Sequence, residues 1–362
     1  MVLKRLNKRN LISNIVAVTL LLVFSIIIKG SVSLPNIFSL IFIYSIAALA
    51  LNVICGCLGE FVLGHGGFLL MGYTIAVLIA QIFKKLIDPS FLKQSIYTPR
   101  GAVLHPLGYL LIIGIVLIAG LITGIIGLIV GTIALGRLKG DYLAIVTLGI
   151  SLIFVNICKN FKVLGGASGK GAASYLGGTP LLYAIFLVIV VFIIVSFMKS
   201  RFGRSILACR DDNIAAEASG VHVSKYKVLA FTFASIIAGI AGALLANYTT
   251  YAPINFGQDF SILFLIIIVL GGLGSLTGSI LASGLIVFYE QWFCKQSWVP
   301  EFFASNPKII YGIVLVLIML FRTSGILGTS EFTWDWFYST VKKLFNKVKS
   351  LFKKKPSKEV NE

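Results

Sequence analysis

The chain alternates between long apolar runs and short polar segments, and most of the runs are long enough to cross a lipid bilayer. A membrane-spanning helix needs about 20 consecutive apolar residues. The candidate runs are 11–29, 36–55, 60–83, 107–134, 143–158, 181–199, 226–248, 259–272, 276–294 and 307–321. This pattern predicts an all-α fold: a polytopic transmembrane bundle of about ten helices over residues 1–330.

Some of these spans are expected to be short or broken. Runs 259–272 and 276–294 are separated by a turn that contains Gly271, Gly272 and Gly274, and run 60–83 begins in a glycine-rich stretch. Irregular backbone at membrane depth is tolerated only where it is buried in protein or faces water. We therefore expect these breaks to lie inside the bundle.

The composition excludes a soluble globular protein. Hydrophobic residues make up 58% of the chain and charged residues 12%, whereas soluble domains contain about 25% charged residues. The net charge of +18 is not a nucleic-acid signature, because the cations lie in clusters between apolar runs. The cysteines and histidines are scattered, with no second pair beside Cys55 and Cys57, so no metal site is predicted.

The distribution of Lys and Arg predicts the orientation. With the N-terminus inside, the inner segments hold 21 of these 31 residues and the outer segments hold 10. Because inner loops are enriched in Lys and Arg, both termini are expected in the cytoplasm. Run 11–29 is longer than the apolar core of a signal peptide and is interpreted as a retained first span.

The inner segment of about residues 200–225 is expected to contain a short helix. Asp211 or Asp212 is a good N-cap, and Gly220 is suited to the position just after the helix. A helix of about two turns is not stable alone in water, so other residues must hold it. It has a low-profile surface formed by Ala215, Ala216 and Ala218. It is either an ordinary connection or a docking helix for another protein.

A nucleotide site is not predicted in this chain. The segment Gly165–Gly171 resembles a phosphate-binding loop, but Leu164 stands where the first glycine is needed and Gly171 where Ser or Thr is needed. Any ATP-driven work would therefore be done by another chain.

Several stretches resemble motifs of one membrane protein family. Leu63–Tyr73 is similar to its LGHxxFxxxGAY element, Arg137–Gly149 to RGDYLAIVTLG, and Val269–Gly278 to VLGGxGSxxG. Gly203–Gly220 resembles its ATPase-coupling loop, and Phe321–Gly328 its FRPxGLxG element. The family is the permease subunits of branched-chain amino acid ABC importers, of the LivM type.

This resemblance implies a prokaryotic cell-membrane protein without catalytic residues or a cofactor of its own. The implied partners are a second permease subunit, identical or different, two cytoplasmic ATPase subunits that bind ATP and Mg²⁺, and an extracytoplasmic binding protein. The implied ATPase-coupling residues are Arg204, Arg210, Asp211, Asp212, Ala215, Ala216 and Gly220. Either arginine would pair with ATPase carboxylates, or would only mark the inner membrane boundary.

Glycines and ionisable groups within the spans are candidates for lining the translocation path, since intramembrane charges and broken helices often mark such paths. The candidates are Glu60, Gly64, His65, Gly66, Gly67, Gly271, Gly272 and Gly274. The alternative is structural: the glycines permit close helix packing, and His65 bonds a backbone carbonyl. Asp141 is expected to cap the helix that begins near Tyr142.

Residues 331–362 form a basic tail. Between 331 and 355, apolar residues recur at spacings of three and four and lysines interrupt them. This pattern predicts an amphipathic helix on the anionic inner leaflet. Nucleic-acid binding is the weaker interpretation of this tail.

Two alternative functions stay open. Permeases for nucleosides, sugars or urea share the superfamily, and Leu164–Lys170 departs from the usual TGGPNG element on the outer side. A self-sufficient secondary transporter would need no ATPase, and its coupling charge would be Glu60.

Overall fold

The computed structural model describes residues 34–86, 106–135, 140–160, 179–249, 256–296, 300, 302, 307–321 and 325. The predicted first span 11–29, the outer segment Leu164–Lys170 and the amphipathic tail 331–355 lie outside these residues.

The described residues form helices and contain no strand, which confirms the all-α prediction for this part of the chain. The long helices are α3 (Leu34–Asn52), α4 (His65–Leu86), α6 (Pro106–Ala134), α7 (Asp141–Asn160), α8 (Pro180–Lys199) and α11 (Val223–Tyr248). The shorter ones are η1 (Val53–Leu58), α9 (Arg201–Asp211), α10 (Asn213–Ala218), α12 (Phe256–Gly271), α13 (Leu276–Gln291), η5 (Phe293–Lys295) and α15 (Pro307–Phe321).

Six of these helices are long and apolar enough to cross a membrane. They correspond to six of the predicted runs. The runs predicted at 259–272, 276–294 and 307–321 form the shorter helices α12, α13 and α15, of 16, 16 and 15 residues. The total of about ten spans therefore stays a prediction.

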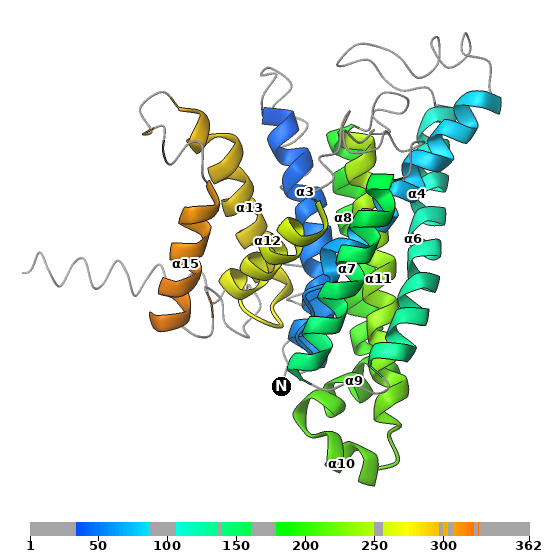
Figure 1. Ribbon diagram of the computed structural model, residues 1–362, viewed down its shortest axis with the longest axis vertical. Coiled ribbons are helices and arrows are strands. Elements are labelled where there is room, and N and C mark those ends of the chain that lie inside the picture. The colour runs from blue at the N-terminus through cyan, green and yellow to red at the C-terminus, as the bar shows by residue number, and fades with distance from the viewer. Residues whose placement is uncertain are drawn as a thin grey trace, which may run out of the picture.

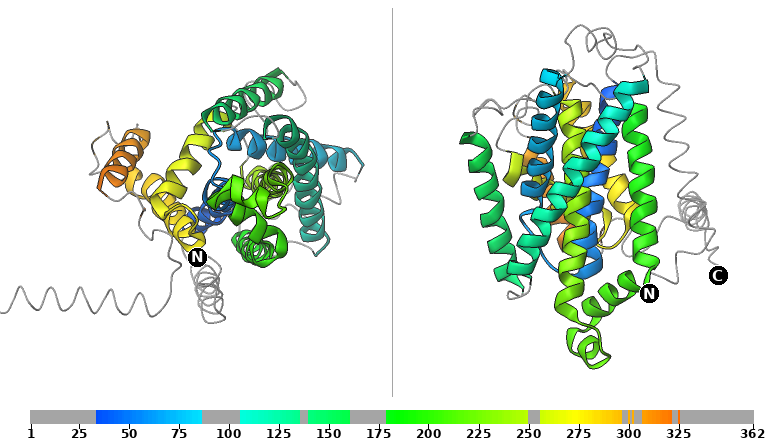
Figure 2. Two further views of the ribbon diagram at one scale, coloured as in Figure 1. Left: turned by 90° about the horizontal axis from the view of Figure 1, so that it is seen from below. Right: turned by 90° about the vertical axis from the view of Figure 1, so that its right-hand side faces the viewer.

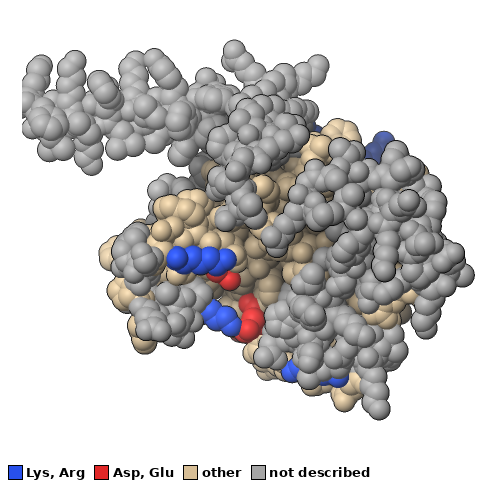
Figure 3. All heavy atoms as spheres, turned by 90° about the horizontal axis from the view of Figure 1, so that it is seen from above, with Lys and Arg blue, Asp and Glu red and all other residues tan. Residues whose placement is uncertain are grey.

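The long helices run side by side (Figures 1 and 2). Helix α11 packs against α3, α4 and α6, and α3 packs against α8, α11, α12 and α13. Helices α3 and α11 are largely buried, whereas α6 and α7 expose much of their apolar surface. Helices α9 and α10 project beyond one end of the bundle, below α11 in Figure 1. Figure 3 shows the opposite end, where blue and red groups lie next to each other within a tan area.

Glycines allow α4 and α6 to approach α11 closely. A Cβ atom at Gly239 of α11 would lie 2.6 Å from Thr123 Cβ of α6, and one at Gly242 would lie 2.8 Å from the Tyr73 nitrogen of α4. Membrane helices use small residues in this way, because close backbone approach increases van der Waals contact. The buried centre of the bundle depends on these crossings.

The predicted run 60–83 begins differently in the structure. The π-helical segment η1 continues α3 and ends at Leu58. The next residue, Gly59, has a φ of 82°, which suits glycine. Residues 60–64 are not helical, and α4 begins only at His65. The glycine-rich break that the sequence predicted before α4 is thus a real interruption between two helices.

Candidate functional site

The projecting segment 201–222, which we call the α9–α10 unit, has the caps that its sequence predicts. Asp212 Oδ1 accepts hydrogen bonds from the backbone nitrogens of Ile214 and Ala215, at 2.8 and 3.2 Å. At the other end of α10, Gly220 has a φ of 82°, and the Val221 nitrogen donates to the Ala216 oxygen at 3.0 Å. Between the two candidates for the N-cap, the structure selects Asp212, whereas Asp211 is exposed at the end of α9.

A small apolar cluster, separate from the main core, holds α10 in place. Its buried members are Cys209, Ala216 and Val223, with Tyr226 packed against them. Burial raises the pKa of the Cys209 thiol, with Lys227 acting in the opposite direction. The cluster meets the expectation that such a short helix needs support from neighbouring residues.

The outer side of α10 carries a residue that the sequence analysis did not single out. Ile214 is 81% exposed, and Ala215 and Ala218 are also exposed, whereas Ala216 faces the cluster. The sequence of this short helix carried no signal for it, because only the structure shows that Ala216 faces inward. An exposed isoleucine between small residues can enter a pocket on another protein.

The two predicted coupling arginines are both exposed but have different partners. Arg204 Nη1 donates to the Lys199 oxygen of the preceding helix at 3.0 Å. Arg210 extends from the end of α9 to η1, where its Nη1 donates to the Gly56 oxygen. The Arg210 stem lies against Gly59, where an added Cβ would be 3.0 Å from Arg210 Cγ. Pairing of either arginine with another subunit stays a prediction.

Glu60 forms an ion pair with Lys227 of α11. The two side chains are only 13% and 8% exposed. The pair connects the break before α4 with the second turn of α11. Glu60 is one of the predicted path residues, and its charge is balanced by Lys227 of the same chain in this structure.

Asn52 connects η1 with the turn between α12 and α13. Its Oδ1 accepts from the Gly274 nitrogen at 2.8 Å, and its Nδ2 donates to the Ser275 oxygen at 3.0 Å. Asn52 is fully buried. Gly274 has a φ of 90°, and Gly272 of the same turn has a φ of 109°. Gly271 is also buried and packs against Gly278 of α13.

The first turn of α4 is tightly packed. A Cβ at Gly64 would lie 2.9 Å from Thr147 Cβ, and one at Gly67 would lie 2.7 Å from Ser151 Cα. The Gly66 nitrogen donates to Ser261 Oγ at 2.8 Å. These contacts match the close-packing alternative, and in this conformation no substrate-sized space separates α4 from α7 or α12 at these glycines.

His65 is buried and lies 3.0 Å, through Nε2, from the Ala47 oxygen of α3. This contact matches the carbonyl bond that the sequence analysis gave as its alternative to path lining. Asp141 is the first residue of α7, close to the expected position, and is exposed.

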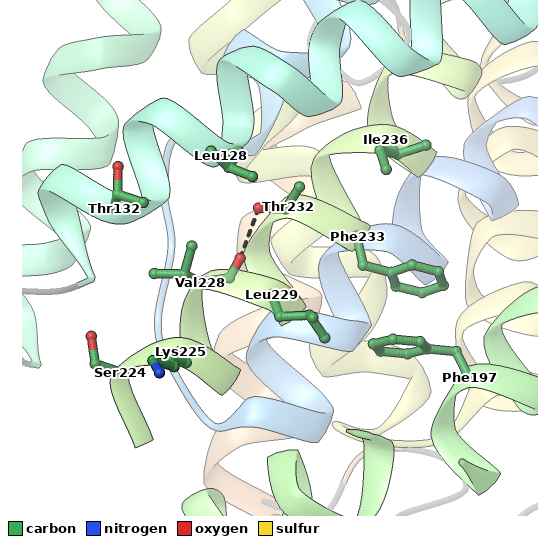
Figure 4. A pocket seen from close by; sticks show the side chains of 10 residues that line it. All are labelled: Leu128, Thr132, Phe197, Ser224, Lys225, Val228, Leu229, Thr232, Phe233 and Ile236. Atoms are coloured by element: carbon green, nitrogen blue, oxygen red, sulfur yellow. Dashed lines mark hydrogen bonds between the residues drawn. The ribbon is translucent and has the colours of Figure 1, made fainter. Parts of the chain in front are cut away.

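A groove of about 630 Å³ lies between α6, α8 and α11. Figure 4 shows Leu128 and Thr132 of α6 on one side, and Phe197 of α8 stacked on Phe233 of α11, with ring centroids 4.0 Å apart. None of the predicted path residues lines this groove. Its walls are apolar except near Lys225 and a few hydroxyl groups.

The described residues contain no group of three His, Cys, Asp or Glu side chains that could hold a metal ion. Some of their buried polar groups make contacts between helices, as Asn52, His65 and Ser261 do. At the α9–α10 end, α10 lies on the outer side and η1 is contacted by Arg210.

Comparison with known proteins identifies relatives over most of the chain. The LivM permease protein of the high-affinity branched-chain amino acid transport system of Salmonella typhimurium is 30% identical over 335 residues, which cover 83% of this chain and 70% of that protein. The Escherichia coli LivM protein is 30% identical over 328 residues, with coverage of 81% and 69%. The LivH permease protein of Salmonella typhimurium is 25% identical over 48% of this chain and 54% of its own length.

No solved structure matches the chain. Residues 33–319 match the family described as "Branched-chain amino acid transport system / permease component". This range includes every helix described above except the last residues of α15. The chain belongs to this family of multi-pass membrane permeases.

Proposed function

We propose that the chain is the transmembrane subunit of an ATP-driven importer for branched-chain amino acids. It is coupled to two separate ATPase subunits, and it receives its substrate from an extracytoplasmic binding protein. The observation that most supports this proposal is the α9–α10 unit, a capped helical projection held by its own small core. A self-sufficient transporter has no need for such a projection.

The exposed side of α10 forms the ATPase-docking surface. Ile214 enters a pocket on the ATPase, while Ala215 and Ala218 allow its backbone to come close. Exposed Arg204 pairs with a carboxylate at the rim. ATP and Mg²⁺ are bound by the ATPase subunits, and this chain holds no cofactor.

The α9–α10 end faces the cytoplasm. The described helices carry Lys199, Arg201, Arg204, Arg210, Lys225 and Lys227 at this end, and Lys84, Lys85, Lys159, Lys295 and Lys308 toward the other end. Among the described residues the two ends are thus nearly even, and support for this orientation comes from the full sequence, in which the expected inner segments hold 21 of the 31 Lys and Arg residues. Both termini are then cytoplasmic, in the cell membrane of a prokaryote, and the basic tail 331–362 contacts anionic lipids rather than nucleic acid.

A second permease subunit completes the membrane part. The chain resembles both LivM and LivH permease proteins, and the names of these relatives point to two kinds of permease protein in such systems. A heterodimer with a LivH-like subunit is therefore favoured over a homodimer. The translocation path lies along the glycine-rich breaks, including Gly64, Gly67 and Gly271, once the packing seen here opens.

The relatives' names favour leucine, isoleucine and valine as substrates over nucleosides, sugars or urea. The test is uptake into proteoliposomes that contain the chain together with its second permease subunit and ATPases, with binding protein added outside and ATP inside. We expect ATP-dependent uptake of labelled leucine, and no uptake of adenosine or urea.

The same preparation separates the importer from a secondary transporter. Proteoliposomes with the chain alone should take up no leucine under an ion gradient. Gradient-driven uptake by the chain alone would contradict the importer proposal. ATP-dependent uptake of adenosine instead of leucine would keep the importer class and change the substrate.

A further inference from the structure

The α9–α10 unit and the helix that follows it, α11, contact the same short segment of the bundle. Arg210, at the end of α9, donates a hydrogen bond to the Gly56 oxygen. Lys227, one turn after α11 begins, forms the ion pair with Glu60. Gly56–Glu60 is therefore the segment that both the end of α9 and the start of α11 contact.

The Arg210 contact is specific in its geometry. The Gly56 carbonyl lies near the end of η1, where backbone oxygens lack partners within the helix and the helix dipole favours a cation. Gly59 leaves room for the arginine stem, and an added Cβ at Gly274 would lie 3.6 Å from Arg210 Nη1. The guanidinium thus lies between η1 and the turn that joins α12 to α13.

The Glu60–Lys227 pair is almost completely removed from solvent. Removing one partner of such a pair leaves an uncompensated buried charge, which is strongly unfavourable. The pair therefore keeps residue 60 attached to α11 as long as both charges are present. The start of α11 cannot shift without moving the break before α4.

Asn52 extends the connection to a third element. Its amide bonds Gly274 and Ser275, so η1 is joined to the α12–α13 turn. Single-turn π-helical segments are rare and are often found at functional positions. A displacement of η1 therefore reaches the two glycine-rich breaks that the sequence identifies, the one before α4 and the one between α12 and α13.

We propose that Gly56–Glu60 is the segment that transmits the movement of α10 to the translocation path, with Arg210, Lys227 and Glu60 as its positioning residues. This inference rests on the proposed function, because it requires an ATPase that moves α10. Arg210 thereby acts inside the chain, in addition to any contact with the ATPase.

The experiment measures leucine uptake and ATP hydrolysis in the same proteoliposomes with the complete importer. The variants are Arg210→Gln, Arg210→Lys, Glu60→Gln and the charge exchange Glu60→Lys with Lys227→Glu. The control is Lys308→Gln, which breaks a solvent-exposed ion pair with Asp259 at the opposite end of the bundle. The decisive quantity is leucine taken up per ATP hydrolysed.

We expect Arg210→Gln and Glu60→Gln to keep ATP hydrolysis within about twofold of the original protein and to lower uptake per ATP by about tenfold, a typical size for coupling between sites. Arg210→Lys should be intermediate, the charge exchange should recover most of the ratio, and Lys308→Gln should leave it unchanged. ATP hydrolysis retained by each single variant shows that it folds and assembles, and recovery by the exchange shows that the ion pair itself carries the effect.

A purely structural role gives a different result. If uptake and hydrolysis fall together in Arg210→Gln and Glu60→Gln, so that their ratio stays constant, the inference is wrong. It is also wrong if the charge exchange recovers nothing while the exchanged protein assembles and hydrolyses ATP. If the original complex shows no ATP-dependent leucine uptake, the proposed function itself fails.

Discussion

Replacement of Asn52 by leucine should destabilise the bundle more than the same change at any other buried asparagine described here. Asn52 is fully buried and makes two hydrogen bonds to backbone groups of a turn more than 220 positions away, at Gly274 and Ser275. Leucine has a similar size and satisfies neither group. The backbone N–H and C=O of the turn would then be buried without these partners.

The expected loss follows from the two orphaned groups. Each buried polar group left without a partner costs about 1–3 kcal/mol. The free energy of unfolding of Asn52→Leu should therefore fall by about 2–6 kcal/mol. Asn52→Asp retains an acceptor for Gly274 but loses the donor to Ser275 and buries a charge, so it should not recover the loss.

Asn247 of α11 provides a matched control. It is 1% exposed, but its Nδ2 bonds only the Ala243 oxygen of its own helix, and its Oδ1 has no partner among the described residues. Asn247→Leu removes an unsatisfied oxygen and a local bond that the helix does not require. We expect a change within about 1 kcal/mol, because burying an unpaired polar atom is itself unfavourable.

The assay is unfolding of the purified variants in mild detergent, followed by a fluorescent thiol probe and by circular dichroism. An Asn52→Leu loss below about 1 kcal/mol, or an equal loss in Asn247→Leu, would refute the idea that the Asn52 amide holds the α12–α13 turn to η1.

Further predictions concern the α9–α10 unit. Ile214→Ala should weaken ATPase binding at least about tenfold, since burial of an isoleucine on docking contributes about 1.5–3 kcal/mol. The measurement is the affinity of each variant for the purified ATPase, and Ile262→Ala, which changes an exposed isoleucine of α12, should show no such effect. Gly220→Ala should lower the unfolding free energy by about 1–2 kcal/mol, because alanine is strained at the φ of 82° found there. An added Cβ meets no other atom, so the loss reports the backbone strain alone. Gly149 also has open space around it but lies within α7, so Gly149→Ala should raise the unfolding free energy by about 0.5–1 kcal/mol in the same unfolding assay. Burial raises the pKa of Cys209, so less reactive thiolate is present at neutral pH; peptide mass spectrometry should show modification by N-ethylmaleimide at least about tenfold slower in the folded protein than after unfolding.

Features that depend on local chemistry were predictable from the sequence. A cap at Asp211 or Asp212, of which the structure selects Asp212, and the left-handed Gly220 follow from short-range hydrogen bonding and from the conformational freedom of glycine. The apolar runs gave the helices to within a few residues, because a buried or lipid-facing helix requires an unbroken apolar stretch. The prediction for 107–134, for example, compares with Pro106–Ala134 in the structure.

Features that depend on distant partners were not predictable. Lys227 had the same appearance as the other basic residues that mark an inner membrane boundary, and nothing in its surroundings indicated a partner 167 positions earlier at Glu60. For Arg210 the sequence suggested pairing with an ATPase or marking the inner membrane boundary, and its bond to the backbone of its own chain was not foreseen. Backbone acceptors such as the Gly56 oxygen are invisible in a sequence, since every residue has one.

The assignment of sides on α10 shows why the site was only partly predictable. A two-turn helix has too few residues for a periodic pattern, so the alanines at 215, 216 and 218 all seemed to belong to one surface. The structure turns Ala216 toward Cys209 and Val223, and this leaves Ile214 outside. The side of α10 that faces inward is fixed by residues of α9 and α11, which lie before and after α10 in the sequence. The sequence of 211–220 alone does not contain them. The proposed docking surface is therefore defined by how α10 packs on its neighbours rather than by its own composition.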